Sequence, residues 1–282
     1  MTLKQRHLIG QIFAVVSFIA TAVGIVFLAV LLIDILRDGA GRLSLAFLDG
    51  FPSRFAERTG VKPALYGSIW TLVLTAIISF PIGVGTAIWL EEYATRNRFT
   101  KLVQINIANL AGVPSIVYGI LGLAVFVHFL HLGRSILSGA LTLALLILPV
   151  IIIASQEAIK AVPSSIRLGA YALGATRWET VRFHVLPQAM PGILTGTILA
   201  LSRAIGEAAP MLMIGALAFV PFIPDGPLDE FTVIPIQIFN WVSKPQAGFH
   251  EAAAAASIVL LIVLLTLNAV AILLRNRYMR KQ

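Results

Sequence analysis

The sequence predicts an all-α integral membrane protein with about six transmembrane helices. Of its 282 residues, 58% are hydrophobic and only 12% are charged, whereas roughly a quarter of the residues in ordinary soluble domains are charged. Several apolar stretches exceed the roughly 18 residues that indicate a membrane span, because a hydrocarbon core about 30 Å thick needs about 20 helical residues. These stretches are continuous and do not alternate in polarity, which favours helices over the strands of a transmembrane barrel.

Six spans are expected, all within a single domain that covers residues 1–282. The spans are residues 8–35, 64–90, 102–130, 136–155, 191–220 and 252–274. The first apolar run continues to Ile33, which is longer than the core of about 7 to 15 residues in a cleavable signal peptide, so it is expected to remain as a span. The stretch 221–251 is expected to contain either a short surface or re-entrant helix near Val233–Val242 or an interfacial loop, with Trp241 at headgroup level.

The net charge of +8 is distributed over the ends of the apolar segments and does not gather into one patch. This distribution argues against nucleic-acid binding and favours membrane orientation by basic residues. Most of the 21 Lys and Arg residues fall on the cytoplasmic side if the N-terminus is inside. We therefore expect a multi-pass protein of the bacterial inner membrane with cytoplasmic N- and C-termini.

Several kinds of chemistry are excluded by what the sequence lacks. The chain has no cysteine, which removes disulfides, thiolate catalysis and iron–sulfur ligation. It has no G-x-x-x-x-G-K-[ST] loop for nucleotide phosphates and no H-E-x-x-H motif, and its five histidines are dispersed. No covalent catalysis and no metal site are expected, and ATP, if it drives this protein, is expected to bind another chain.

The polar stretch 156–190 is too long for a tight turn and too charged to be buried in a membrane. Ser165–Leu173 is expected to form a short helix that ends at Gly174, because glycine readily adopts the positive φ found just beyond a helix end. Thr176, with Glu179 three residues later, forms a capping box that begins a second helix. Pro187 and Pro191 are expected to end this hairpin, which is either an ordinary amphipathic surface feature or an element that transmits motion between a soluble domain and the spans.

This stretch resembles the cytoplasmic loop of the ABC importer permeases, in which E-A-A is followed by a glycine and then by I-x-L-P. Leu168 and Gly169 replace the glutamate and the first alanine of that pattern, and His184 replaces the isoleucine. The resemblance implies the type I ABC importer permease architecture, with a coupling-helix hairpin that docks on an ATPase subunit. The residues it places in this contact are Leu168, Gly169, Ala170, Gly174, Ala175, Thr176, Leu186 and Pro187.

Four further stretches are similar to the phosphate-specific ABC importers, and most similar to their A-type membrane subunit, although the sister subunit has related motifs. They are Pro81–Gly85, Leu90–Tyr93, Gly112–Gly119 and Arg203–Glu207. The resemblance implies four kinds of partner, namely a second, similar permease subunit, two ATPase subunits that hold ATP and Mg, an external phosphate-binding protein, and the lipid bilayer. It implies no cofactor in this chain.

Arg203 and Glu207 are the charged pair within the expected fifth span. At positions i and i+4 of a helix the two side chains share a face and can pair, which reduces a cost estimated at about 2.5 to more than 10 kcal/mol for an isolated charge in the bilayer. Pro210 lacks an amide hydrogen and is expected to kink the helix beside them. Arg203 would offer a permeating oxyanion its planar, permanently charged guanidinium. The alternative is an ion pair that only packs helices or joins a partner subunit.

Pro81 and Pro114 are expected to interrupt the second and third spans. Ser115 and Tyr118 are candidate pathway residues near the second of these breaks, although such breaks are often ordinary kinks. Gly192 and Gly196 form a G-x-x-x-G motif that favours close helix packing.

The function predicted from these features is that of a membrane permease subunit of an ATP-driven phosphate importer. Two alternatives remain open, a permease for another oxyanion such as sulfate, molybdate or phosphonate, and an ion-driven carrier or channel with Glu207 as its ion site.

Overall fold

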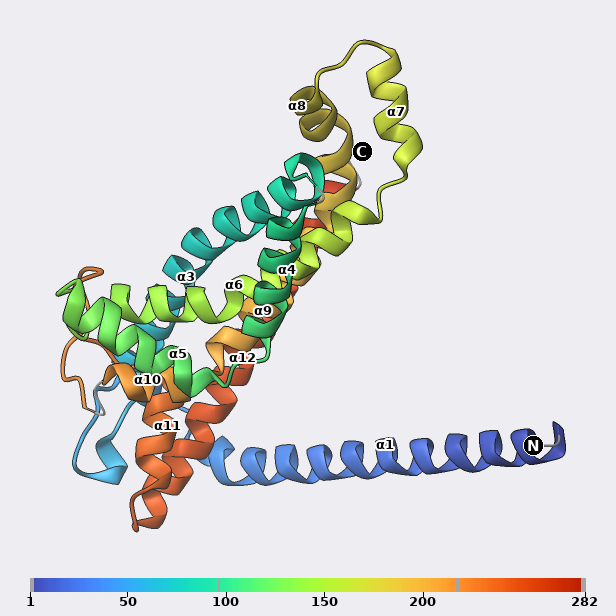
Figure 1. Ribbon diagram of the computed structural model, residues 1–282. Coiled ribbons are helices and arrows are strands. Elements are labelled where there is room, and N and C mark those ends of the chain that lie inside the picture. Colours follow the sequence, from blue (N-terminus) through green and yellow to red (C-terminus); the bar gives the residue numbers. More distant parts are fainter. Residues whose placement is uncertain (1–2, 96, 217–218, 280–282) are drawn as a thin grey trace.

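The computed structural model describes residues 3–95, 97–216 and 219–279, and these ranges are almost entirely helical (Figure 1). The α-helices are α1 (Leu3–Gly39), α2 (Leu45–Asp49), α3 (Lys62–Ile88), α4 (Arg98–Ala111), α5 (Ser115–Gly122), α6 (Ile136–Lys160), α7 (Ser164–Ala172), α8 (Arg177–Thr180), α9 (Leu186–Ile205), α10 (Ala209–Ile214), α11 (Ile234–Val242) and α12 (Ala247–Met279). π-Helical turns occupy Trp89–Tyr93, Leu123–Phe129 and Val181–Val185, and 3-10 turns occupy Ala40–Arg42 and Ala56–Arg58. Within the described ranges, five helices are long and apolar enough to cross a membrane, and the bent α4–α5 pair is a sixth candidate. The predicted all-α membrane architecture with about six spans is confirmed.

Helices α3, α6 and α9 form the centre of the bundle, and α6 is the most enclosed of the spans. The side chains of Ile147 and Ile151 on α6 have no exposed surface. Helix α3 packs closely on α6 because Gly83 has no side chain, and a Cβ atom there would lie 2.6 Å from Ile151. The Thr75 hydroxyl on α3 donates a hydrogen bond to the Ala140 carbonyl, 3.2 Å away on α6. Small residues and hydroxyl groups therefore join these two helices, as is common between membrane helices.

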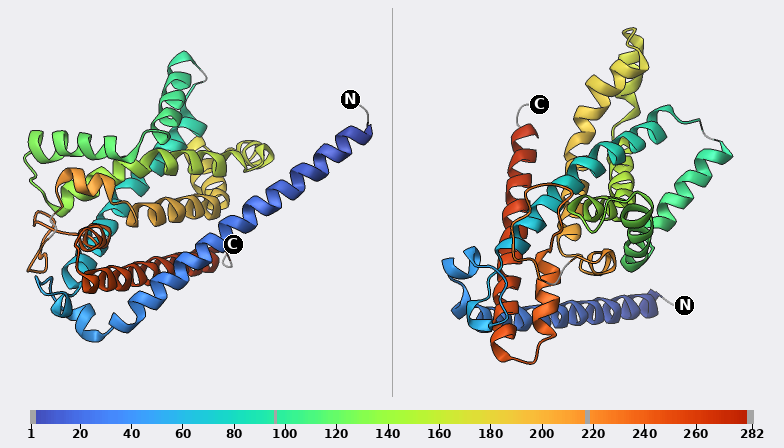
Figure 2. Two further views of the ribbon diagram at one scale, coloured as in Figure 1. Left: turned by 90° about the horizontal axis from the view of Figure 1, so that it is seen from below. Right: turned by 90° about the vertical axis from the view of Figure 1, so that its left-hand side faces the viewer.

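Helix α1 projects away from the rest of the bundle in all views (Figures 1 and 2). In its most apolar stretch of 18 residues, no residue is buried by the rest of the protein. It packs against α12 near its C-terminal end, where a Cβ atom on Gly39 would lie 2.7 Å from the Ala254 backbone. A long helix with apolar side chains on every face needs lipid or another protein around it.

The segment expected as one straight third span, residues 102–130, is sharply bent. Helices α4 and α5 meet at an angle of 103°. The bend lies at Gly112 and Pro114, and proline disfavours helical backbone in the residue before it. The expected interruption at Pro114 is therefore confirmed, whereas that at Pro81 is wrong, because α3 continues through Pro81.

The bounds expected for the fifth span, residues 191–220, are wrong at both ends. Helix α9 begins at Leu186, with Pro187 in its first turn and Pro191 inside it, so these prolines do not end the hairpin. The helical segment that begins at Arg177 continues through both prolines, with the π-helical turn Val181–Val185 directly before α9. At its other end α9 stops at Ile205, and the short helix α10 follows after a break.

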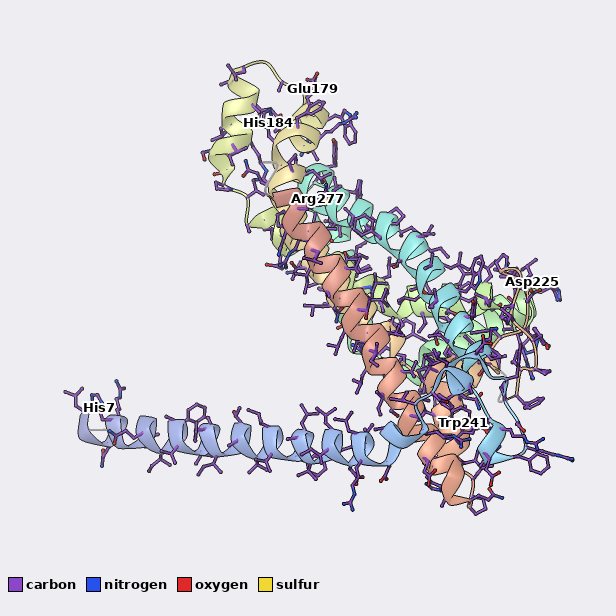
Figure 3. All side chains as sticks on the ribbon, turned by 180° about the vertical axis from the view of Figure 1, so that it is seen from behind. His7, Glu179, His184, Asp225, Trp241 and Arg277 are labelled. Atoms are coloured by element: carbon purple, nitrogen blue, oxygen red, sulfur yellow. The ribbon has the colours of Figure 1, made fainter. Side chains whose placement is uncertain are left out.

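The end of the bundle that carries α7 and α8 is called the hairpin end. The other end holds α2 and α11, where Trp241 packs against Phe47 with ring centroids 6.0 Å apart (Figure 3). The helix expected near Val233–Val242 is confirmed as α11, and Trp241 is only 1% exposed because it packs inside the protein. The apolar face of α11 packs on α12 and encloses the indole ring.

Candidate functional site

The α7–α8 hairpin has the corner that the sequence predicts. Gly174 lies between the two helices with a φ of +83°, in the left-handed region that glycine adopts without strain. The Thr176 backbone N–H donates to the Glu179 carboxylate at 2.8 Å, and the Glu179 N–H donates to the Thr176 hydroxyl at 3.3 Å. The predicted capping box is therefore confirmed. The hydrogen bonds from the Thr176 backbone and hydroxyl hold the pKa of the Glu179 carboxyl below its usual value.

The outer surface of the hairpin carries several large apolar side chains, although the stretch 156–190 is polar overall. Leu173 and Leu168 are 90% and 66% exposed, and Trp178 and Phe183 are 57% and 61% exposed. Large exposed apolar patches mark contact surfaces in soluble regions of proteins. Of the predicted contact residues, Leu168, Gly169, Gly174 and Thr176 are exposed, Ala175, Leu186 and Pro187 are half-buried, and Ala170 is buried.

The base of the hairpin is held by an ion pair that sequence reasoning missed. Arg167 on α7 donates to the Glu92 carboxylate from Nε at 3.0 Å and from Nη2 at 2.6 Å. Glu92 is only 5% exposed. The same guanidinium donates to the carbonyls of Val162 and Ile159 at 2.7 and 3.0 Å. A buried carboxylate needs such pairing, so Arg167 links the end of α3 to the hairpin.

Two neighbours of Glu92 make further links to the same region. Glu91 accepts a hydrogen bond from the Gln156 amide at 2.8 Å, near the end of α6. The Tyr93 ring lies 5.2 Å from the Arg177 guanidinium, at the start of α8. The stretch Leu90–Tyr93 thus contacts α6, α7 and α8. The signal in the sequence was the pair of carboxylates directly after an apolar span, which implies basic partners nearby.

The predicted pair of Arg203 and Glu207 is present, but not on one helix. Arg203 Nε lies 3.2 Å from the Glu207 carboxylate. Arg203 is in the last turn of α9, whereas Glu207 lies in the break between α9 and α10. A cation in the last turn of a helix is favoured by the negative end of the helix dipole. The Arg203 side chain is 54% exposed and that of Glu207 is 16% exposed, so the pair presents its positive partner outward.

Glu207 faces the centre of the bundle. It lines a small cavity together with Ser68 and Thr71 from α3 and Met211 from α10. The break at residues 206–208 therefore brings a carboxylate beside two hydroxyl groups of a neighbouring span. In a continuous α9 helix, Glu207 would lie on the same face as Arg203, one turn further on.

The other two predicted pathway residues lie at the α4–α5 bend. The Tyr118 hydroxyl donates to the Leu110 carbonyl at 2.8 Å and so connects the two sides of the bend. Ser115 is the first residue of α5 and is half-buried. Helix α5 packs on α10, because a Cβ atom on Gly119 would lie 2.7 Å from Pro210. The bent segment α4–α5 therefore contacts the interrupted segment α9–α10. The Tyr118 hydroxyl, however, bonds within the α4–α5 bend and not across this contact.

Residues that could hold a metal ion are not gathered anywhere in the ranges that the structure describes, since no group of three or more His, Asp or Glu side chains has suitable geometry there.

Residues 79–281 match the family described as the binding-protein-dependent transport system inner membrane component. The chain belongs to this family. Its members are membrane permease subunits, so the multi-pass permease character expected from the resemblance is confirmed.

Several relatives resemble the chain over most of its length. It is 33% identical over 287 residues to the phosphate transport system permease protein PstA 1 of Mycobacterium tuberculosis (strain H37Rv), covering 98% of this chain and 90% of the relative. It is 30% identical over 268 residues to the PstA permease of Pasteurella multocida, covering 94% of each. It is 35% identical over 217 residues to the probable ABC transporter permease protein YqgI of Bacillus subtilis, covering 73% of this chain and 74% of the relative.

Solved ABC importers share the fold. A chain of the bacterial alginate ABC transporter, in complex with its alginate-bound periplasmic protein, superposes with a TM-score of 0.66 at 14% identity, covering 95% of each chain. A chain of the MetNI methionine ABC transporter in an inward-facing conformation gives a TM-score of 0.61 at 14% identity, covering 76% of this chain and 93% of the other. The permease fold expected from the sequence, type I ABC importer architecture included, is confirmed.

Proposed function

We propose that this chain is a membrane-spanning subunit of an ATP-driven importer of inorganic phosphate. The observation that carries the proposal is the Arg203 guanidinium, held at the end of α9 by Glu207 and more than half exposed. The similarity to PstA proteins over nearly the whole chain supports phosphate as the cargo. An arginine guanidinium is permanently charged and matches the oxygens of a phosphate ion in two parallel hydrogen bonds.

The α7–α8 hairpin is the element that would dock on the ATPase subunits, which would hold ATP and Mg. Its exposed apolar side chains, led by Leu173 and Trp178, suit a groove on a soluble partner. The sequence has no phosphate-cradling loop of its own. A second, similar permease subunit and an external phosphate-binding protein would complete the assembly in the bacterial inner membrane, with the hairpin end and both termini in the cytoplasm.

Motion of the hairpin can reach Arg203 through one continuous helical segment. From Arg177 to Ile205 the chain forms a continuous helical segment of 29 residues, and Arg203 is two residues from its end. At about 1.5 Å per residue, the arginine lies roughly 40 Å from the start of α8. A tilt imposed on α8 by an ATPase would therefore displace the guanidinium and change which side of the membrane it faces.

Glu207 sets how strongly Arg203 holds an anion. The Glu207 carboxylate lies 3.2 Å from Arg203 Nε and partly neutralises the guanidinium. An arriving phosphate competes with Glu207 for the Nε–H group of Arg203, and the carboxylate reclaims it on release. A transport site must bind weakly enough for the cargo to leave, and an internal competitor provides that property.

The rival functions differ in measurable ways. A permease for sulfate, molybdate or phosphonate would use Arg203 in the same manner, because a guanidinium does not choose among tetrahedral anions. An ion-driven carrier would use Glu207 as a proton or ion site and would need no ATPase. The exposed apolar hairpin favours the importer, since a carrier that works alone has no use for such a surface.

The test is uptake of labelled phosphate by cells in which this chain is the only copy of its kind. We expect Arg203→Gln to lower the uptake rate by about tenfold or more, the effect of losing a charged hydrogen bond of about 1.5–3 kcal/mol. We expect Glu207→Gln to lower both KM and the maximal rate, because phosphate binds more tightly and leaves more slowly. The amount of assembled complex is measured in parallel by co-purification of the ATPase.

The matched control is Arg277→Gln, which removes an exposed arginine from the last turn of α12 and should leave uptake unchanged. Normal transport by both Arg203→Gln and Glu207→Gln would end the proposed role of this pair. Phosphate accumulation by vesicles that contain this chain without any ATPase would favour the carrier instead.

A further inference from the structure

A polar pocket of about 850 Å³ lies at the hairpin end, away from Arg203 and outside the α7–α8 hairpin. It is bounded by the π-helical turn Trp89–Tyr93 that follows α3, the first two turns of α4 and the end of α6. We call it the α4 pocket. The residues that line it are Leu90, Glu91, Ala94, Asn97, Arg98, Thr100, Lys101, Gln104 and Lys160.

The charges of the α4 pocket do not balance. Its one carboxylate, Glu91, already accepts a hydrogen bond from Gln156 at 2.8 Å and lies 3.6 Å from Lys160. Lys160 is also paired with Glu157 at 3.0 Å. Arg98 and Lys101 form no ion pair within the described residues. Two cations therefore face one concave space without a protein anion to neutralise them.

The position of these two cations in their helix adds to the imbalance. Arg98 and Lys101 are three residues apart, so they project from neighbouring points on one side of α4. Both lie in or next to the first turn, where no acidic residue is present. The N-terminus of a helix carries a partial positive charge and favours anions, so cations there are opposed by the dipole. An anion in the pocket would relieve this unfavourable interaction with the dipole.

The α4 pocket lies where polar side chains meet exposed apolar side chains of α4. Phe99 and Leu102, which alternate with the two cations along α4, are 64% and 59% exposed. Asn97, Thr100 and Gln104 add neutral polar side chains to the lining of the pocket. A membrane phosphate headgroup lies at such a boundary, and basic pockets between transmembrane helices bind anionic headgroups.

We propose that the α4 pocket binds an anionic phosphate group through Arg98 and Lys101. The group is either the headgroup of an anionic phospholipid or a free phosphate ion. Arg98 supplies a planar set of donors for the phosphate oxygens, and Lys101 supplies a compact charge. The bound anion neutralises the first turn of α4 and lies beside Glu91 and Lys160, which join α3 to α6. The inference does not depend on the proposed transport function, because it concerns a separate set of residues.

The test uses the purified full-length chain in detergent, with phosphatidylglycerol and phosphatidylcholine as probes and native mass spectrometry as the readout. We expect the wild type to retain phosphatidylglycerol in preference to phosphatidylcholine. The variant Arg98→Gln/Lys101→Gln should lower the retention of phosphatidylglycerol by roughly tenfold, given the contribution of each basic residue near an anionic headgroup. Both residues are exposed on α4, and Lys101→Gln alone serves as the test should the double variant fail to fold.

A second arm distinguishes the two sources of the phosphate group. Millimolar inorganic phosphate, added without phosphatidylglycerol, should raise the melting temperature of the wild type more than that of the double variant, which keeps Arg203, if the free ion is the occupant. If only phosphatidylglycerol gives a difference between wild type and variant, the lipid is the occupant. Either result supports the pocket.

The matched control is again Arg277→Gln, which removes one exposed arginine at the hairpin end but outside the α4 pocket (Figure 3). It should leave both readouts unchanged. The proposal is overturned if the double variant behaves as the wild type does in both arms, or if Arg277→Gln causes an equal loss, because retention would then reflect overall charge alone.

Discussion

Arg167 shows how one residue can decide the stability of the α7–α8 hairpin. Its guanidinium makes two hydrogen bonds to the buried Glu92 carboxylate and one each to the carbonyls of Val162 and Ile159. Removing the cation leaves Glu92 without a counter-charge in a site that is 5% exposed. The loss is costly because a buried carboxylate cannot recover its hydration.

We expect Arg167→Gln to lower the stability of the hairpin region by about 3–5 kcal/mol, the range for breaking one side of a buried ion pair. The double variant Glu92→Gln/Arg167→Gln should recover part of this loss, because the amides remove the buried charge. The measurement is thermal unfolding in detergent together with protease cleavage within residues 173–176. Lys160→Gln is the matched control, since its side chain is 49% exposed and such pairs contribute at most about 1 kcal/mol. An Arg167→Gln protein as stable as the Lys160→Gln control would contradict the structural role of this pair.

Arg203 and Arg167 differ in how readily their ion pairs can be predicted from the sequence. A charged residue within an apolar stretch is rare, so Arg203 and Glu207 were predicted directly as a pair. Arg167 lies in a polar stretch where basic residues are ordinary, and its partner is 75 residues away. The sequence therefore predicted the first ion pair and missed the second.

At the scale of the elements, α6 and α9 are joined by small residues, as the G-x-x-x-G motif predicted. A Cβ atom on Gly192 would lie 2.7 Å from the Cβ of Ala158, and one on Gly196 would come still closer to Ala154. The two glycines are one turn apart on α9 and both face α6. Their role is close packing, which the sequence had favoured over any chemical role.

We expect Gly196→Ala to lower the melting temperature in detergent, because the added methyl group forces α6 and α9 apart at a typical cost of about 1–3 kcal/mol for overpacking. The matched control is Gly24→Ala on α1, where a Cβ atom would have no neighbour within 4 Å. The control should be neutral or slightly stabilising, because alanine favours a helix more than glycine does. Equal melting temperatures for Gly196→Ala and the wild type would show that the α6–α9 contact can widen freely.

At the scale of the whole molecule, the two ends of the bundle are suited to opposite sides of a membrane. The hairpin end carries α7, α8 and the last turn of α12, whereas α2, α11 and the connection that contains Asp225 lie away from it (Figures 1 and 3). The distribution of basic residues predicts that the hairpin end is cytoplasmic. The chain contains no cysteine, so single cysteines can be introduced as labels without removing any.

We expect Arg277→Cys, at the hairpin end but outside the α7–α8 hairpin, to be protected from a membrane-impermeant maleimide in intact cells and to react after permeabilisation. Asp225→Cys should react in intact cells. Both residues are exposed in the structure, so access to the reagent depends on the side of the membrane and not on packing. The cysteine-free wild type is the control. The opposite labelling pattern would reverse the proposed orientation and place the hairpin where no ATPase could reach it.

The sequence by itself determined the class of the protein, the number of its spans and the shape of the hairpin corner. Transfer into a membrane depends on composition averaged over about 20 residues, and the capping box depends on residues three apart. Both can be read along the chain. The positive φ of Gly174 and the hydrogen bonds between Thr176 and Glu179 are therefore present as predicted.

Only the tertiary structure decided where the fifth span breaks and which distant residues meet. Average hydropathy continues past Ile205, but the helix ends there, and the break turns Glu207 toward Ser68 and Thr71 on another span. Arg167 meets Glu92 only because α3 and α6 lie side by side with the hairpin above them. Contacts of this kind depend on the geometry of packed helices, and no local pattern in the chain encodes that geometry.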